Sequence, residues 1–170
     1  MRQESAKRIR AYKYLKFIYI PVIAAVACLV SANWYQLSLI HGDSMSPAYH
    51  DMQFVLIDRH SGQYTYGDVV TFHCENLDAA LVKRIVACPG DRVMIGHGTL
   101  YVNDAVSQVF PEPGIFEYSG TAGDGVVLEE NQYFVIGDNL GESRDSRYDE
   151  VGIINEDDII GKIIPYINVK

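Results

Sequence analysis

A stretch without any charged side chain, residues 17 to 35, constrains the fold of this chain more than any other feature. It reads FIYIPVIAAVACLVSANWY, and an α-helix needs about 20 predominantly apolar residues to cross the hydrocarbon core of a bilayer. Pro21 falls near the first turn, where a missing backbone N–H costs little, and Trp34 and Tyr35 suit the interface between lipid and water. The stretch therefore predicts a transmembrane helix over residues 17 to 35.

The charges on the two sides of this stretch differ in sign. Six of the 14 Lys and Arg residues precede residue 17, together with a single acidic residue, whereas residues 17 to 170 carry 8 basic and 21 acidic residues. Because positive charge accumulates on the cytoplasmic side of membrane helices, we expect a cytoplasmic basic head at 1–16 and an extracytoplasmic body at 36–170. The body lacks the clustered Lys and Arg that bind phosphates, which argues against nucleic acid as its partner.

Two other interpretations of the apolar stretch stay open at this point. It could form a buried core helix, or it could be the apolar region of a cleavable signal peptide, because Val30-Ser31-Ala32 has the small residues of a cleavage site. The transmembrane helix and the cleavable signal peptide would both place the body outside the cytoplasmic membrane.

The body shows the pattern of strands separated by turns. Apolar and β-branched residues alternate with polar ones in short runs that Gly, Pro, Asn or Asp interrupt. We expect strands at 53–58, 68–73, 80–87, 91–95, 99–103 and 132–138, and short strands rather than a helix near the C-terminal end, where Pro165 would break a helix. The sequence GHG at 96–98 predicts a hairpin turn, and the Gly-rich, acidic stretch at about 105–130 predicts an extended excursion. The prediction is a mainly β body in one domain.

The body contains two cysteines, Cys74 and Cys88, and Cys28 lies in the apolar stretch. A hairpin around residues 75–80 would set Cys74 opposite Leu81 and Cys88 opposite Gly67. That offset is far beyond the roughly 7 Å between Cα atoms that a disulfide permits, so we expect free thiols.

A serine in the tight turn GDSMSP (42–47), Ser44, is the first candidate for chemistry. A nucleophilic serine needs a neighbouring base. His41 and His50 flank the turn, but we interpret them as surface residues. The other candidate base is Lys83, and a lysine accepts a proton only when burial lowers its pKa from about 10.4.

Lys83 and Arg84 are adjacent within LVKRIVA, and strand periodicity sets them on opposite faces. Lys83 shares its predicted face with Leu81, Ile85 and Ala87. One of the two charges must then lie against an apolar face, and lysine loses its proton more readily than arginine. The alternative is that both side chains extend to solvent from a twisted edge strand.

The third polar stretch is GDNLGESRDSR at 137–147. Its oxygen-bearing side chains do not follow the spacing of a calcium-binding loop, so we expect a turn network that supports a nearby charge. We expect neither a metal nor a cofactor.

Together, GDSMSP (42–47), GDVVTF (67–72), LVKRIVACPGD (81–91) and GDNLGESRDSR (137–147) resemble the four soluble motifs of type I bacterial signal peptidases, in the family's order and after one membrane segment. The resemblance implies a β-rich catalytic domain of twisted antiparallel sheets and a membrane-anchored protease with a Ser-Lys dyad. Gly42, two residues before Ser44, matches the small Gram-positive members rather than those with a second serine there, and Ala48 replaces the usual threonine.

The resemblance also assigns roles to individual residues. It implies that Ser44 is the nucleophile, that Lys83 is the general base, and that Ser46 has no chemical role. Supporting and oxyanion roles fall on Ser143, Asp145 and Asp43, and substrate contacts on Met45 and Gln53. The remaining motif positions are structural: Pro47, Gly67, Asp68, Arg84, Gly90, Asp91, Gly137, Asp138, Asn139, Ser146 and Arg147.

The implied substrates are preproteins with Ala-x-Ala cleavage sites, and the implied partners are the lipid bilayer and the secretion machinery. One alternative is a related factor dedicated to surface pilus assembly, with pilin precursors as substrates or with no proteolytic activity. Such degenerate relatives would be expected to lose the serine or the lysine, and this chain keeps both. Self-cleaving repressors share the Ser-Lys chemistry, but they carry a DNA-binding head where this chain is basic and then apolar.

Overall fold

The computed structural model describes residues 19–26, 28, 33–110, 112 and 114–165. Contacts divide the chain into two compact units, Met1–Gln36 and Leu37–Lys170. In the first unit, residues 19–26 are helical. Among the described residues no helix combines the length and the apolar character that a membrane crossing requires. Part of the transmembrane helix predicted over 17–35, namely residues 17, 18, 27 and 29–32, lies outside the described residues.

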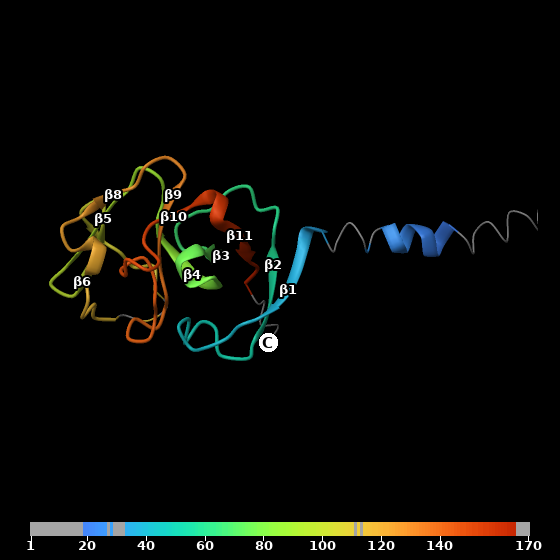
Figure 1. Ribbon diagram of the computed structural model, residues 1–170, viewed down its shortest axis with the longest axis horizontal. Helices are drawn as coiled ribbons and strands as arrows, with labels where there is room; N and C mark the ends of the chain where they lie inside the picture. The colour runs from blue at the N-terminus through green and yellow to red at the C-terminus, as the bar shows by residue number, and fades with distance from the viewer. Residues whose placement is uncertain (1–18, 27, 29–32, 111, 113, 166–170) are drawn as a thin grey trace, which may run out of the picture. The chain divides into compact units, whose positions relative to one another are not determined.

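The second unit is built on two antiparallel sheets, as the mainly β prediction requires (Figure 1). The larger sheet has the strand order β1 (Tyr35–Leu39), β2 (Phe54–Asp58), β11 (Ile159–Ile163), β3 (Val69–Cys74), β4 (Ala79–Ala87), β9 (Gln132–Ile136) and β10 (Ile154–Asn155). The smaller sheet has the order β7 (Ala105–Val106), β6 (Thr99–Val102), β5 (Arg92–Gly96) and β8 (Val126–Val127). Three short 3-10 helices connect strands: η1 (Glu75–Leu77), η2 (Gly120–Ala122) and η3 (Glu156–Asp158).

The predicted strands are confirmed to within two residues at their ends. The predicted hairpin turn between β5 and β6 is also present, with Gly96 opposite Thr99. His97 and Gly98 have φ values of 50° and 74°, and two-residue hairpin turns with positive φ at both positions match the twist of the flanking strands.

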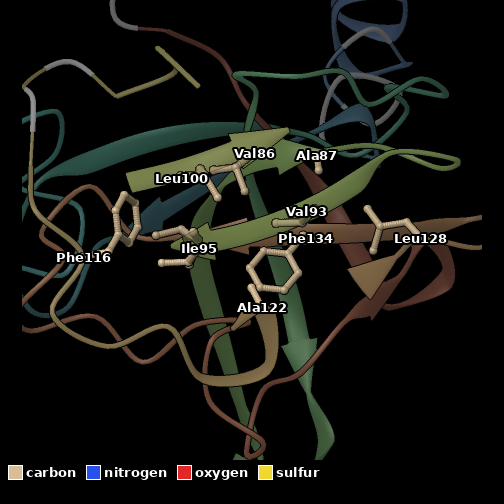
Figure 2. Packing of buried hydrophobic residues seen from close by; sticks show 10 residues of the cluster. Val86, Ala87, Val93, Ile95, Leu100, Phe116, Ala122, Leu128 and Phe134 are labelled. Atoms are coloured by element: carbon tan, nitrogen blue, oxygen red, sulfur yellow. The ribbon is translucent and has the colours of Figure 1, made fainter. Parts of the chain in front are cut away.

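The two sheets meet through a shared apolar cluster (Figure 2). Val86 and Ala87 of β4 and Phe134 of β9 pack there against Val93 and Ile95 of β5. A second cluster includes Ile40, Met45, Tyr49, Val55 and Ile57. It lies where the 42–50 turn packs on β2, so the turn that carries Ser44 is anchored to the larger sheet by buried side chains.

Four details differ from the sequence-based expectations. Cys74 lies opposite Ala79 rather than Leu81, because η1 and the left-handed Asp78 close a tighter turn than expected. Ala87 does not share the packing of Ile85, since a register shift between them interrupts the alternation of β4. Tyr35 begins β1 instead of ending a helix. Strands β7 and β8 and η2 lie within the 105–130 excursion.

Candidate active site

The turn after β1 holds Ser44 in a fixed position. Gly42 has a φ of 83°, a left-handed conformation that favours glycine. The amide of Ser46 donates to Asp43 O, and that of Tyr49 donates to Met45 O. The Met45 side chain is 1% exposed, so it anchors the turn in the core and leaves Ser44 half-buried beside it. The Ser46–Pro47 peptide bond is cis.

Lys83 reaches this turn from the middle of β4. Its Nζ lies 2.8 Å from Ser44 Oγ, to which it donates a hydrogen bond, and 2.9 Å from Val82 O. The Lys83 side chain is 3% exposed, which contradicts the alternative in which it extends to solvent. Burial lowers the pKa of Lys83 to about 8, with Asp145 opposing and Arg147 reinforcing the shift. A substantial fraction of Lys83 is therefore neutral in mildly alkaline solution.

The polar loop after β9 forms the buried floor beside Lys83. Asp145 is fully buried and pairs with the Arg147 guanidinium, with Nε 2.7 Å from Oδ1. Its other oxygen accepts the amide of Gly137, and Ser146 Oγ accepts the amide of Val135 in β9. These bonds satisfy the buried charges and fix the loop to the sheet.

Ser143 is the exception in this loop. Its Oγ is buried and has no hydrogen-bond partner among the described residues. A Cβ built on Gly137 would overlap Ser143 Oγ and lie 2.5 Å from the backbone oxygen of Ser44. The backbone of Ser44 and the side chain of Ser143 therefore approach Gly137 more closely than a Cβ at that position permits, and the Ser143 hydroxyl in this junction has no partner among the described residues.

The same loop holds the backbone of the Ser44 turn. The Asn139 amide donates to Ser44 O at 3.0 Å, and Asn139 Nδ2 donates to Asp43 O at 3.2 Å. Asp43 Oδ1 in turn accepts the amide of Asp51. The Ser44 amide has no acceptor within the described part of the chain, so it is free to bind an incoming oxygen.

The other motif residues build the surroundings. Arg84 forms a two-bond ion pair with Asp138 and donates to Gly67 O. Asp68 pairs with Lys162 at 2.7 Å. Asp91 Oδ2 accepts the amide of Cys88, and Gly90 has a φ of 85° in the turn between them. These contacts hold β3, β4 and the loop after β9 in register around Lys83.

Met45 and Gln53, which were predicted to contact the substrate, lie in different surroundings. Gln53 lines a cavity of about 720 Å³ with Pro47, Tyr49 and Arg84, and its Oε1 accepts the amide of His50. Met45 is part of the core. Neither Ser44 nor Lys83 lines that cavity. His41 and His50 are exposed, and Cys74 and Cys88 are free thiols.

Sequence reasoning treated Asn139 only as a structural motif position and missed its contact with the Ser44 turn. Spacing carried no signal for that contact, since 96 residues separate Asn139 from Asp43. Among the described residues there is no cluster of His, Cys, Asp or Glu suited to hold a metal ion.

The arrangement can carry out nucleophilic acyl transfer. It offers a hydroxyl in contact with a buried amine whose pKa is lowered, and, on the same serine, a backbone amide that has no acceptor among the described residues. The surrounding charges are paired with one another rather than directed at a ligand.

Comparisons with known proteins identify a family and several relatives. A family model described as signal peptidase, peptidase S26, matches residues 11–167. The chain is 34% identical to signal peptidase I U of Bacillus subtilis, covering 91% of this chain and 87% of that protein. It is 31% identical to signal peptidase I of Bacillus licheniformis, with the same coverage of both. It is also 33% identical to signal peptidase IB of Staphylococcus aureus, covering 73% of each chain.

Proposed function

The chain belongs to the signal peptidase family, peptidase S26, and we propose that it is a signal peptidase I, a serine endopeptidase that removes N-terminal signal peptides from exported preproteins. The observation that carries the proposal is the 2.8 Å contact between Lys83 Nζ and Ser44 Oγ. A serine beside a buried lysine whose pKa is lowered is a pairing that lets a serine protease work without a histidine base.

The proposed reaction begins with neutral Lys83. Its Nζ takes the proton of Ser44 as Oγ attacks the carbonyl carbon of the last signal-peptide residue. The tetrahedral intermediate then expels the mature chain's amino group, which receives the proton from Lys83. The signal peptide stays as an ester on Ser44. Water, deprotonated by Lys83, attacks this ester, and Ser44 Oγ leaves as it takes the proton back from Lys83. The signal peptide is released with a free carboxyl group, and the serine hydroxyl and the neutral lysine are restored.

The oxyanion of the intermediate is stabilised by the Ser44 amide. Gly42 supplies no side chain at the position where some relatives carry a second serine, so the backbone carries this role. The hydrogen bond from the Asn139 amide to Ser44 O supports this role. It fixes the peptide bond between Ser44 and Met45 and so keeps the turn in one conformation.

Ser143 and Asp145 are positioning residues in this proposal. The unpartnered Ser143 hydroxyl is available to orient the Lys83 amine when Lys83 leaves Ser44 during the reaction. Asp145 holds Arg147 and the Gly137 amide, so it stabilises the loop on which Ser143 stands.

The substrate joins the sheet as an extra strand. Residues 79–83 of β4 pair only with β3 among the described residues, because the β9 pairing begins at Arg84. This leaves an open strand edge that ends at Lys83. A signal peptide with small residues at the first and third positions before the cut can pair along it, since alternate side chains of a strand face the same way.

The proposed topology follows the charge pattern of the sequence. The basic head at 1–16 lies in the cytoplasm, the apolar stretch that begins at residue 17 crosses the cytoplasmic membrane once before β1 begins at Tyr35, and the catalytic domain lies outside it. In this arrangement the enzyme contacts the lipid bilayer and receives its substrates from the secretion machinery.

The test is cleavage of a purified preprotein with an Ala-x-Ala site in detergent. The wild type should cut it, and Ser44→Ala and Lys83→Ala should reduce kcat by about 10³-fold or more, as loss of a nucleophile or its base does. Ser61→Ala, a serine in a distant loop, is the matched control. Folded wild type that cuts neither this substrate nor pilin precursors would contradict the proposal and favour an assembly factor.

A further inference from the structure

A groove adjoins the Ser44 turn at Ser46 and Pro47, the residues that follow Met45. Its first part is a cavity of about 350 Å³ whose walls include Pro47, Asn139, Leu140, Glu112 and Ile115. A second cavity of about 260 Å³ shares Ile115 and Leu140 with the first and continues to Glu117 and Tyr118. We call these two adjoining cavities the exit groove. It begins at the residues that hold the nucleophile, because Asn139 also donates to Ser44 O.

The direction in which the substrate binds determines which side of the scissile bond would occupy the exit groove. A preprotein passes Ser44 with residues on both sides of the scissile bond. The signal-peptide side needs a regular strand edge, since its first and third residues must face small pockets, and the edge at residues 79–83 supplies one. The residues after the cut need a separate path away from Ser44, and the cavity walled by Pro47, Asn139 and Leu140 lies next to the Ser44 turn without using that strand edge.

The charged groups along the exit groove are unbalanced. Asp138 is paired with Arg84, and Arg147 is paired with Asp145. Glu112 and Glu117 are exposed, and neither has an ion-pair partner among the described residues. The groove wall therefore carries net negative charge.

Apolar contacts complete the groove. Ile115 is 77% exposed and Tyr118 is 47% exposed, and the Tyr118 ring stacks on Tyr148 at 4.8 Å between centroids. Leu140 lies against Gly114, where a Cβ would overlap its side chain. The wall thus combines the apolar residues Ile115 and Leu140, which both cavities share, with Glu112 in the first cavity and Glu117 in the second.

We propose that the exit groove binds the first residues of the mature chain, and that Glu112 and Glu117 favour basic over acidic residues there. The inference rests on the proposed function and adds a charge preference on the side of the cut away from the signal peptide. It assigns no new chemistry. The two glutamates act on binding and on the positioning of the mature chain.

The test uses three preproteins that are identical through the Ala-x-Ala site and carry Lys, Gln or Glu at the second and fourth mature positions. For the wild type at low salt, kcat/KM should fall in the order Lys, Gln, Glu, with about fivefold between the extremes, the size expected for partly exposed charges. The ratio should shrink towards one at 1 M NaCl, where the Debye length is about 3 Å. The Glu112→Gln/Glu117→Gln double variant should bring the Lys to Glu ratio near one at low salt.

The matched control is Glu129→Gln/Glu130→Gln, two exposed acids in the turn before β9, which should keep the wild-type ratio. Equal cleavage of the Lys and Glu substrates by the wild type would overturn the inference. So would a ratio that persists in the groove variant, or one that the control variant lowers equally. Failure of the proposed function would look different, because none of the three substrates would be cut in a Ser44-dependent way.

Discussion

The amide of Asn139 donates a 3.0 Å hydrogen bond to the backbone oxygen of Ser44. Ser44 is therefore held from two directions, through its side chain by Lys83 of β4 and through its backbone by the loop that follows β9. Since Gly137 and Ser143 belong to the same loop, a shift of this loop would move the serine, the unpartnered hydroxyl and the lysine relative to one another. The site is therefore a junction of three segments: the Ser44 turn, β4 and the loop after β9.

Cleavage should increase with pH because Lys83 must be neutral to accept a proton. Its pKa is lowered to about 8 by burial, so Lys83 is protonated below that pH and neutral above it. We expect kcat/KM to rise tenfold per pH unit below the pKa and to level off above pH 8 to 9. A profile measured from pH 6 to 10 on one preprotein checks this. A flat or falling profile would contradict Lys83 as the base.

The same burial predicts a pH-dependent stability difference. The pKa of Lys83 is lower in the folded protein than in the unfolded chain, so the unfolded state binds more protons between about pH 8 and 10.5. Stability from this group therefore rises with pH across that window and is lowest below pH 8. Lys83→Met removes this dependence.

Urea unfolding of the wild type and of Lys83→Met at pH 7 and pH 10 measures the effect. We expect the variant's advantage in free energy of unfolding to be larger at pH 7 than at pH 10 by about 2 kcal/mol. Only this difference between the two proteins is informative, because tyrosines titrate in the same range. An equal difference at both pH values would show that Lys83 carries no burial penalty.

Ser143→Ala should separate activity from stability. The Ser143 hydroxyl is buried and has no partner in the part of the chain that the structure describes, so its removal costs no hydrogen bond there and should leave the free energy of unfolding unchanged or raise it by about 1 kcal/mol. If Ser143 orients Lys83, kcat should nevertheless fall at least tenfold, with the pH profile altered as well. Unchanged kcat in a fully folded variant would remove Ser143 from the proposed mechanism.

Gly137→Ala should disrupt the junction itself. The added methyl group would overlap Ser143 Oγ and press on the backbone oxygen of Ser44, and such overpacking costs about 1–3 kcal/mol. We expect kcat to drop by about 10² or more because Ser44 is displaced from Lys83. Gly141→Ala in the same loop, where a Cβ meets nothing within 4 Å, is the matched control and should keep wild-type activity.

Much of the fold was predictable because strands leave a local signal. Alternation and turn residues located β2 to β6 and β9, and GHG predicted its hairpin. The predictions from local patterns were wrong where a turn conformation or a register shift, which the sequence does not reveal, changed the pairing of strands. The left-handed Asp78 tightened the β3–β4 turn by two residues, and the register shift in β4 separated Ala87 from Ile85.

By itself the sequence determined which residue types could react. Lys83 and Arg84 occupy adjacent positions of one strand, and Ser44 lies in a turn that begins with Gly42. Both features can be recognised because they involve residues that are neighbours in the sequence. Tertiary structure decided that they meet. Lys83 and Ser44 are 39 residues apart, and the Ser44 turn and Asn139 are more than 90 apart. Their contact depends on the packing of Met45 in the core and on the close approach at Gly137, because burial and contact between distant segments are properties of the folded chain and not of any local pattern.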